Sequence, residues 1–279
     1  MKKRKWRKRF LKALAYISVL IIVLGIIFNQ LLFRLLIGVG SIDINHGNDE
    51  RGNKIMRFAL SKIKNPRENV YHAISVQNTK NGNYDIAMAN LEKAYKINPK
   101  EIGGYYGWVL LYYYHDYEKA LNILNAYDDF TPKFSDYPMG ECIHYLKGLA
   151  HKQLNNYEEA VKEFDVSINN QLKEHSENWV DYTTFLNRGI TLYLQNKNEE
   201  AIKEFERVIR NYKECSEAYY FKGLSFIELN EKEKACENFN EALNLIKKGY
   251  KSSDPYVELF HEIYIQDIEQ SLLNNCMKL

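Results

Sequence analysis

Hydrophobic residues follow two different patterns along this chain, one continuous and one periodic. The continuous pattern is an uncharged, largely apolar run over residues 13–33, which ends at Arg34. At about 1.5 Å per helical residue, such a run spans roughly 30 Å, the thickness of the hydrocarbon core of a bilayer. It shows no polar stripe of the kind that a buried core helix of a soluble protein carries, so it predicts a transmembrane helix over residues 13–33.

The periodic pattern begins near residue 53 and repeats five times. The repeats align on a small residue with successive spacings of 33, 40, 41 and 34, at Ala87, Ala120, Ala160, Ala201 and Ala235. A large apolar residue follows each alanine four positions later, namely Leu91, Leu124, Phe164, Phe205 and Phe239. A glycine precedes the last three alanines by twelve positions, at Gly148, Gly189 and Gly223. These spacings predict paired amphipathic helices, with each glycine where a neighbouring helix approaches closely.

This pattern resembles the tetratricopeptide repeat family, whose period is about 34 residues and whose motif runs Leu-Gly-x-x-Tyr, Ala-x-x-x-Phe, Pro. The prolines twelve positions after the first two alanines, Pro99 and Pro132, fit the motif. The resemblance implies an all-α, right-handed superhelical solenoid. The sequence departs from the motif at Trp108, which stands where a small residue is expected, and at Asn78, which replaces the tyrosine of the first repeat.

The repeats and the apolar run divide the chain into five expected parts. These are a basic head (1–12), the transmembrane anchor (13–33), a flexible linker (34–52), the solenoid (53–251) and a C-terminal capping helix (252–279). Within the solenoid we expect a half-repeat (53–67, with Phe58 in its large apolar position) and full repeats at 68–101, 101–134, 141–174, 182–215 and 216–249. Extra residues lie between repeats at 132–138 and 170–177. The Ser252-Ser253-Asp254-Pro255 sequence predicts the start of the capping helix.

The net charge of +2 conceals a strong asymmetry. Residues 1–12 carry eight positive charges, which leaves 30 basic against 36 acidic residues, a net −6, in the rest. Cations before an apolar span remain in the cytoplasm, so the repeats are expected outside it. A cleaved signal peptide is the rival interpretation, but the nearest small-residue site, Gly38-Val39-Gly40, lies ten residues past Phe28. The basic head indicates topology, and we expect no nucleic-acid partner.

No catalytic motif is present, and we predict a protein without enzymatic activity, cofactor or metal. The run from Asp43 to Asp49 has calcium-loop spacing only in part, and Lys54 stands where the bidentate glutamate belongs. His144 and His151 are seven residues apart, about 10 Å along a helix, too far to share one zinc ion with Cys142. The four cysteines show no C-x-x-C spacing, and free thiols are our default expectation, although disulfides are permitted outside the cytoplasm.

In the family that the repeats resemble, the first helices of successive repeats line a concave surface that binds peptides. Carried over position by position, that surface is apolar and rich in tyrosine, and the expected partner-binding residues are Tyr105, Tyr112, Tyr145, Lys152, Asn187, Tyr193 and Tyr220. Tyrosine is enriched at binding hot spots. For any single tyrosine, packing between helices is the alternative. The Lys, Arg and Asn ring with which some members hold a chaperone's terminal carboxylate is missing, so we expect no chaperone-tail binding.

The sequence therefore predicts a non-enzymatic scaffold or adaptor, anchored in a membrane through residues 13–33, which binds a protein or peptide on its concave surface. Three alternatives stay open. The chain could be an exported soluble binder after signal cleavage, an accessory subunit of an envelope enzyme or secretion complex, or a protein that self-associates through its exposed aromatic groove.

Overall fold

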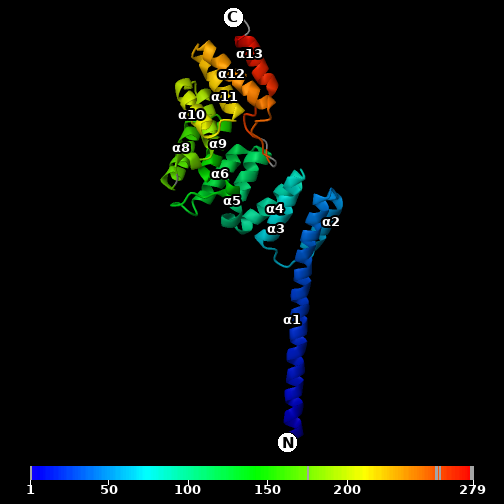
Figure 1. Ribbon diagram of the computed structural model, residues 1–279. Helices are drawn as coiled ribbons and strands as arrows, with labels where there is room; N and C mark the ends of the chain where they lie inside the picture. The colour runs from blue at the N-terminus through cyan, green and yellow to red at the C-terminus, as the bar shows by residue number, and fades with distance from the viewer. Residues whose placement is uncertain (1, 175, 255–256, 258, 277–279) are drawn as a thin grey trace. The chain divides into compact units, whose positions relative to one another are not determined.

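The structure is a computed structural model that describes residues 2–174, 176–254, 257 and 259–276. The described residues form helices and turns, with no strand among them, as an all-α repeat fold requires. The chain divides into two compact units, the first reaching to Ile102 and the second beginning at Gly103. Each unit is built from helices that pair with their neighbours along the chain (Figure 1).

The first unit contains α1 (Lys2–Asn45), α2 (Asp49–Lys62), α3 (Glu68–Lys80) and α4 (Tyr84–Ile97). Its longest helix, α1, continues through most of the segment that we expected to be a flexible linker, residues 34–52, and α2 folds back against its C-terminal end (Figure 1). The linker expectation is therefore wrong. The apolar run leads without interruption into a packed helix pair.

Two glycines explain how α1 and α2 pack so closely. A Cβ atom on Gly40 would lie 2.7 Å from the carbonyl oxygen of Gly52 and 2.6 Å from Cγ of Met56. The spacing of Gly40, Gly52 and Met56 equals that of Gly148, Ala160 and Phe164 in a later repeat. The end of α1 and all of α2 thus form a complete repeat-like pair.

In the half-repeat expected over 53–67, the large apolar position is taken by Met56 and not by Phe58, so the expectation for Phe58 is wrong. Met56 is buried, with 1% of its surface exposed, whereas Phe58 is 53% exposed and meets Phe33 edge to face. Asp43 on α1 also accepts two 2.7 Å hydrogen bonds from the guanidinium of Arg51 on α2. Both oxygens of this carboxylate are therefore committed to the helix pair rather than to a calcium ion.

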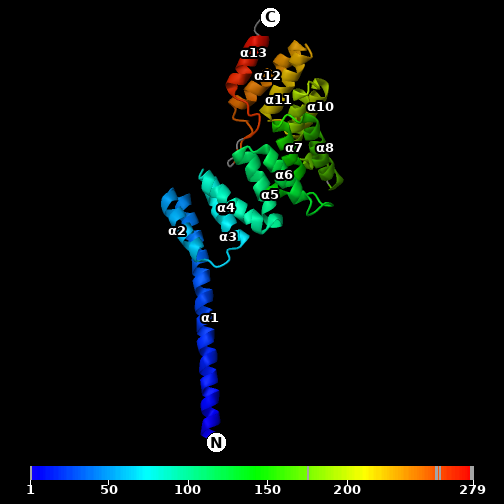
Figure 2. The ribbon, with the colours of Figure 1, turned by 180° about the vertical axis from the view of Figure 1, so that it is seen from behind.

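The second repeat pair consists of α5 (Pro99–Val109), which continues into the π-helical turn η1 (Leu110–Tyr114), and α6 (Tyr117–Asp128). Three further pairs follow: α7 (Ile143–Gln153) with α8 (Tyr157–Glu174), α9 (Tyr182–Leu194) with α10 (Asn198–Asn211), and α11 (Ser216–Glu228) with α12 (Lys232–Lys247). The short turns η2 (Pro138–Gly140) and η3 (Glu177–Trp179) lie in or beside the two inserts. The last helix, α13 (Ile265–Asn275), lies beside α12 (Figure 2).

The recurrent spacing of glycine and phenylalanine in the last three pairs has a direct structural cause. A Cβ atom on Gly148, Gly189 or Gly223 would lie 2.6–2.7 Å from the ring of Phe164, Phe205 or Phe239, respectively. Each of these rings is fully buried. Because the bare Cα lets the facing aromatic ring pack against the helix backbone, the prediction of a close approach at these glycines is confirmed.

The second pair explains why Trp108 stands at the position expected for a small residue. The small residue of this pair is Gly107, where a Cβ atom would lie 2.6 Å from Leu124. Gly107 precedes Ala120 by thirteen positions instead of twelve. The π-helical turn η1 accommodates that additional residue, since a π turn holds one residue more per hydrogen-bonded ring than an α-helix does.

Each turn inside a repeat pair contains a residue with left-handed backbone. These residues are Gly82, His115, Asn155, Asn196 and Asn230. Glycine and asparagine adopt positive φ at low cost, which is why they end helices so often. These left-handed residues therefore let the chain reverse between the two helices of each pair.

The C-terminal cap differs from the expected helix over 252–279. Its predicted first residue, Pro255, lies outside the described residues. Residues 252–254 and 259–264 around it are not helical, and α13 begins only at Ile265. Ile268 and Leu272 of α13 pack into the hydrophobic cluster of α12, so a helix does cover the end of the solenoid.

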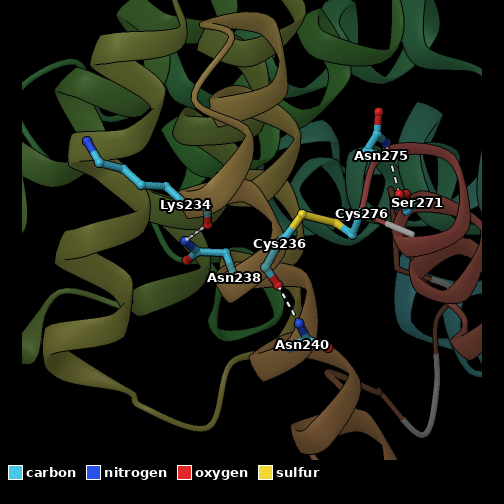
Figure 3. Close-up of a disulfide and its surroundings, with 7 residues drawn as sticks. All are labelled: Lys234, Cys236, Asn238, Asn240, Ser271, Asn275 and Cys276. Atoms are coloured by element: carbon cyan, nitrogen blue, oxygen red, sulfur yellow. Dashed lines mark hydrogen bonds between the residues drawn. A yellow bond between two sulfur atoms is a disulfide. The ribbon is translucent and has the colours of Figure 1, made fainter. Parts of the chain in front are cut away.

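The expectation of free thiols is wrong for two of the four cysteines. Cys236 on α12 forms a disulfide with Cys276, which directly follows α13 (Figure 3). Cys142 and Cys215 are free and buried. The sequence could not show the pairing because Cys236 and Cys276 are 40 residues apart and meet only when α13 folds back.

Candidate functional site

The predicted concave surface of the second unit is covered by the chain's own C-terminal segment. We call this segment, residues 251–264, the strap; its described residues are 251–254, 257 and 259–264. It connects α12 to α13 and runs back along the first helices of the repeats (Figure 2). Leu259, Phe260 and His261 face the groove residues Tyr112, Tyr145, Leu149, Thr183, Leu186 and Asn187.

Phe260 of the strap lies in a cage of three rings, which we call the aromatic cage. Its ring stacks on Tyr112, with centroids 5.6 Å apart and an interplanar angle of 12°. The rings of His115 and Tyr117 lie 6.2 and 6.0 Å from it. The turn after η1 brings the three cage residues together, because His115 has a φ of 51° and reverses the chain between η1 and α6. Such offset and edge-on arrangements are the favourable geometries of aromatic pairs.

A partly buried glutamate fixes Tyr112 in the cage. Glu141 accepts a 2.9 Å hydrogen bond from the Tyr112 hydroxyl and a 2.8 Å hydrogen bond from Nε1 of Trp108. Burial raises the pKa of Glu141, and the two hydrogen bonds oppose that rise. Burial also raises the pKa of Tyr112, so its hydroxyl remains a donor.

The centre of the groove contains a buried lysine without a carboxylate partner among the described residues. Lys152, 2% exposed, donates to Oδ1 of Asn187 at 2.5 Å. The amide of Asn187 donates in turn to the Tyr145 hydroxyl at 3.1 Å and to the Thr183 carbonyl at 2.9 Å. Burial lowers the pKa of Lys152 to about 7 and raises that of Tyr145. The network is polar, but it is sealed from solvent.

His261 of the strap lies over this part of the groove. Its ring is 6.4 Å from that of Phe221, and burial together with the nearby Lys152 lowers its pKa to about 3. The backbone N–H of Ser252 donates to the buried carboxylate of Glu217 at 2.8 Å. A cavity of only about 50 Å³ remains between strap and groove.

The structure brings four of the seven predicted partner-binding residues into this one site: Tyr112, Tyr145, Lys152 and Asn187. The other three lie outside its lining. Tyr105 stacks on Trp108 with centroids 6.3 Å apart, Tyr193 meets Phe221 edge to face, and Tyr220 packs against Phe221 and Phe239. All three are partly buried. Contact with a partner stays a prediction for all seven residues.

Sequence reasoning missed the contribution of the strap and of Glu141 and Glu217. A signal for the strap was present, since Leu259-Phe260-His261 is an apolar and aromatic cluster directly after a proline-containing break. No local signal marks the two glutamates, because each meets its partners only through tertiary contacts.

The histidine considered as a metal ligand, His144, contacts a glutamate. Nδ1 of His144 lies 2.7 Å from the carboxylate of Glu163 on α8. Within the described ranges, no group of three or more His, Cys, Asp or Glu side chains is placed to hold a metal ion.

Comparison with protein families matches the sequence to tetratricopeptide repeats over residues 69–101, 143–168 and 186–251. These segments lie in helix pairs that have the alanine and large apolar spacing described above, with Ser75 in the glycine position of the first. The chain is a tetratricopeptide-repeat protein. Tetratricopeptide repeats serve as protein-interaction scaffolds, and this chain has that architecture.

Solved structures of repeat proteins share the fold. MamA from Desulfovibrio magneticus, residues 41 to the end, aligns with a TM-score of 0.55 at 16% identity and covers 65% of this chain and 96% of its own. The type IV pilus biogenesis factor PilW aligns with a TM-score of 0.58 at 14% identity and covers 77% of this chain and 94% of its own. PilF from Pseudomonas aeruginosa aligns with a TM-score of 0.57 at 15% identity and covers 88% of this chain and 99% of its own. No curated protein sequence matches the chain significantly.

The N-terminal helix also meets the criteria for a membrane span. Within α1, the segment Tyr16–Asn45 is long enough to cross a bilayer and contains an 18-residue stretch with a mean hydropathy of 2.4. Only 6% of its most apolar stretch is buried inside the protein. A signal sequence near an N-terminus has the same features.

Proposed function

We propose that this tetratricopeptide-repeat protein is a non-enzymatic scaffold, anchored in a membrane by α1, which binds a non-helical segment of a partner protein on the concave surface of its second unit. The observation that carries the proposal is the occupied groove. Leu259, Phe260 and His261 lie against the first helices of consecutive repeats, so this surface accommodates a non-helical segment with an aromatic side chain.

Two features support the membrane anchor. The apolar run over 13–33 follows eight positive charges, which favours a span with its N-terminus in the cytoplasm. The helix also continues beyond Arg34 into packing contacts: Ile37 and Ile44 are buried against α2 and α3 in the first unit. Cleavage near Gly38-Val39-Gly40 would remove the start of the segment that packs on α2, and this consequence favours an uncleaved anchor.

The orientation can be tested with a membrane-impermeant thiol reagent. The native cysteines suit this test poorly, since two are buried and two form the disulfide. We therefore suggest Lys162→Cys, whose native side chain is 71% exposed, with Lys3→Cys in the basic head as the control. Labelling of position 162 but not position 3 in cells with an opened outer barrier is expected. The reverse pattern would contradict the proposed topology.

The scaffold role can be tested by photo-crosslinking from native membranes. A photoreactive residue replaces Tyr220, which is partly buried on α11 beside Phe221, the neighbour of His261, or Lys162 on the exposed face of α8 as the control. We expect a discrete crosslinked partner from position 220 that is weak or missing at position 162. Equal products at both positions would mean that the groove does not select the partner. A crosslinked second copy would instead indicate self-association.

A further inference from the structure

The strap shows what kind of ligand the groove accepts. Phe260 supplies a ring to the aromatic cage of Tyr112, His115 and Tyr117, and Leu259 lines the adjacent apolar part of the groove. The polar groups of the groove floor, Lys152 and Asn187, satisfy each other and make no described hydrogen bond to the strap. Beside the backbone hydrogen bond from Ser252 to Glu217, side-chain recognition therefore rests on an aliphatic and an aromatic side chain in sequence.

The strap is nevertheless an imperfect ligand of this groove. His261 adopts a φ of 60°, in the left-handed region that disfavours residues other than glycine and asparagine. Its Nε2 atom is buried and has no hydrogen-bond partner in the described part of the chain. A cavity of about 50 Å³ remains beside it. Each of these features weakens docking, because strain, an unsatisfied polar atom and a void all oppose the apolar contacts.

Contacts between its two ends, and a disulfide beyond it, keep the strap beside the groove. Lys251 pairs with Glu262 at 3.1 Å, and the hydroxyl of Tyr264 donates to the same carboxylate at 2.7 Å. The Cys236–Cys276 disulfide holds the following helix against α12 (Figure 3). A tethered segment competes at an effective concentration of about the millimolar range, so even a weak intramolecular ligand keeps a groove closed.

We propose that the strap is an exchangeable intramolecular ligand, which a partner displaces with a non-helical segment carrying an aliphatic residue, an aromatic residue and then a glycine or asparagine. This inference rests on the proposed function, because both use the same groove. It adds the chemistry of the partner and a closed resting state. A segment with glycine or asparagine after the aromatic residue keeps the Phe260 contacts and avoids the strain and the buried unpaired imidazole of His261.

The experiment measures exchange with a defined probe, a fluorescein-labelled synthetic peptide of residues 251–264. Fluorescence anisotropy follows its binding to the purified full chain in detergent. Three chains are compared: the wild type, Phe260→Ala in the strap, and Phe134→Ala as a control for an aromatic residue that is 65% exposed outside the groove. We expect Phe260→Ala to bind the peptide at least about tenfold more tightly than the other two, since its own strap competes poorly.

Peptide variants then test the recognition chemistry on the Phe260→Ala chain. Loss of the ring in the peptide (Phe260→Ala) should weaken binding at least about tenfold, because the cage is left empty. The peptide with His261→Asn should bind more tightly than the native peptide, because asparagine tolerates left-handed backbone. If Phe260→Ala lowers the helix content of the full chain, Lys251→Ala serves instead, since it opens the ion pair with Glu262 at the base of the strap and leaves the groove intact.

Several outcomes would overturn the inference. Equal peptide binding by a folded Phe260→Ala or Lys251→Ala chain and the wild type would mean that the strap is a permanent part of the fold. Equal binding of peptides with and without the ring would remove the role of the cage. A dimer with exchanged straps in light scattering would make a second copy the occupant. If the peptide does not exchange but position 220 still crosslinks a partner, the strap inference is wrong and the proposed function stands. If the peptide exchanges but no partner crosslinks, the proposed function is contradicted and the strap inference stands.

Discussion

The ring of Phe260 lies parallel to the ring of Tyr112, with an angle of 12° between them and 5.6 Å between their centroids. The two residues are nearly 150 positions apart in the sequence. Their contact closes the concave surface that the repeats build, so the surface on which a partner is expected is already occupied within the chain. The consequences of this arrangement, and of the packing that supports it, can be measured.

Substitution of the repeat glycines should lower stability. In Gly223→Ala the new Cβ atom would lie 2.6 Å from the ring of buried Phe239, so the helices α11 and α12 must separate or the ring must shift. We expect a loss of about 1–3 kcal/mol in the free energy of unfolding, measured by chemical denaturation.

Gly38→Ala on α1 is the matched control, because nothing lies within 4 Å of the position that its Cβ atom would take. Alanine at this helical position should be neutral or should stabilise the chain by up to about 1 kcal/mol. A similar loss of stability in both variants would mean that close approach is not the reason for the repeat glycines.

Loss of the disulfide should loosen the C-terminal cap. Cys276→Ser removes a crosslink that spans 40 residues, which in the chain-entropy account stabilises a fold by at most about 4 kcal/mol. We expect faster hydrogen exchange in α13 and a lower melting temperature than in the oxidised wild type. Reductant should lower the melting temperature of the wild type to that of Cys276→Ser and leave the variant unchanged. A variant as stable as the oxidised wild type would contradict this account.

The buried Lys152 should make stability rise with pH above neutrality. Burial lowers its pKa to about 7 in the folded chain, from an ordinary value of 10.5. Between these values the unfolded chain binds more protons, so raising the pH favours the folded state, by at most about 1.4 kcal/mol per pH unit. Denaturation between pH 7 and about pH 9.5 measures this slope, and Lys152→Met should flatten it. An unchanged slope in Lys152→Met would assign the effect to other groups.

Mild acid should release the strap. His261 has a pKa lowered to about 3 from 6.5, so it docks in its neutral form, and as the pH falls below 6.5 the proton is bound by the undocked strap. The charged or titratable groups around it are Lys152 and Tyr145 on α7, Tyr112 on η1, Glu217 on α11 and Glu262 in the strap itself. We expect hydrogen exchange at residues 259–264 to accelerate from pH 7 to pH 5 beyond its intrinsic pH dependence.

His261→Asn is the control for the release by acid, since asparagine keeps a polar side chain and tolerates the left-handed backbone but does not titrate. Its strap should exchange with only the intrinsic pH dependence. A strap that opens equally in acid in both chains would exclude protonation of His261 as the cause.

The repeat architecture could be predicted from the sequence because its determinants are local and periodic. Gly148 and Phe164 are sixteen positions apart, and the recurrence of that spacing at Gly189 and Gly223 reports the packing of adjacent helices directly. The turns at Asn155, Asn196 and Asn230 follow from the low cost of left-handed backbone for asparagine. The apolar run and the charges before it could also be recognised from the sequence, because length and charge bias are properties of the chain itself.

Only the tertiary structure showed that α1 continues into the first helix pair, that Cys236 bonds to Cys276, and that Phe260 fills the aromatic cage. Gly40 and Gly52 repeat the spacing of later pairs, but their role depends on the contact of two backbones. The strap meets residues far from it in sequence, and no periodic pattern records a contact made once. Repetition therefore let the sequence determine the solenoid, whereas the state of its groove was decided by single long-range contacts between side chains.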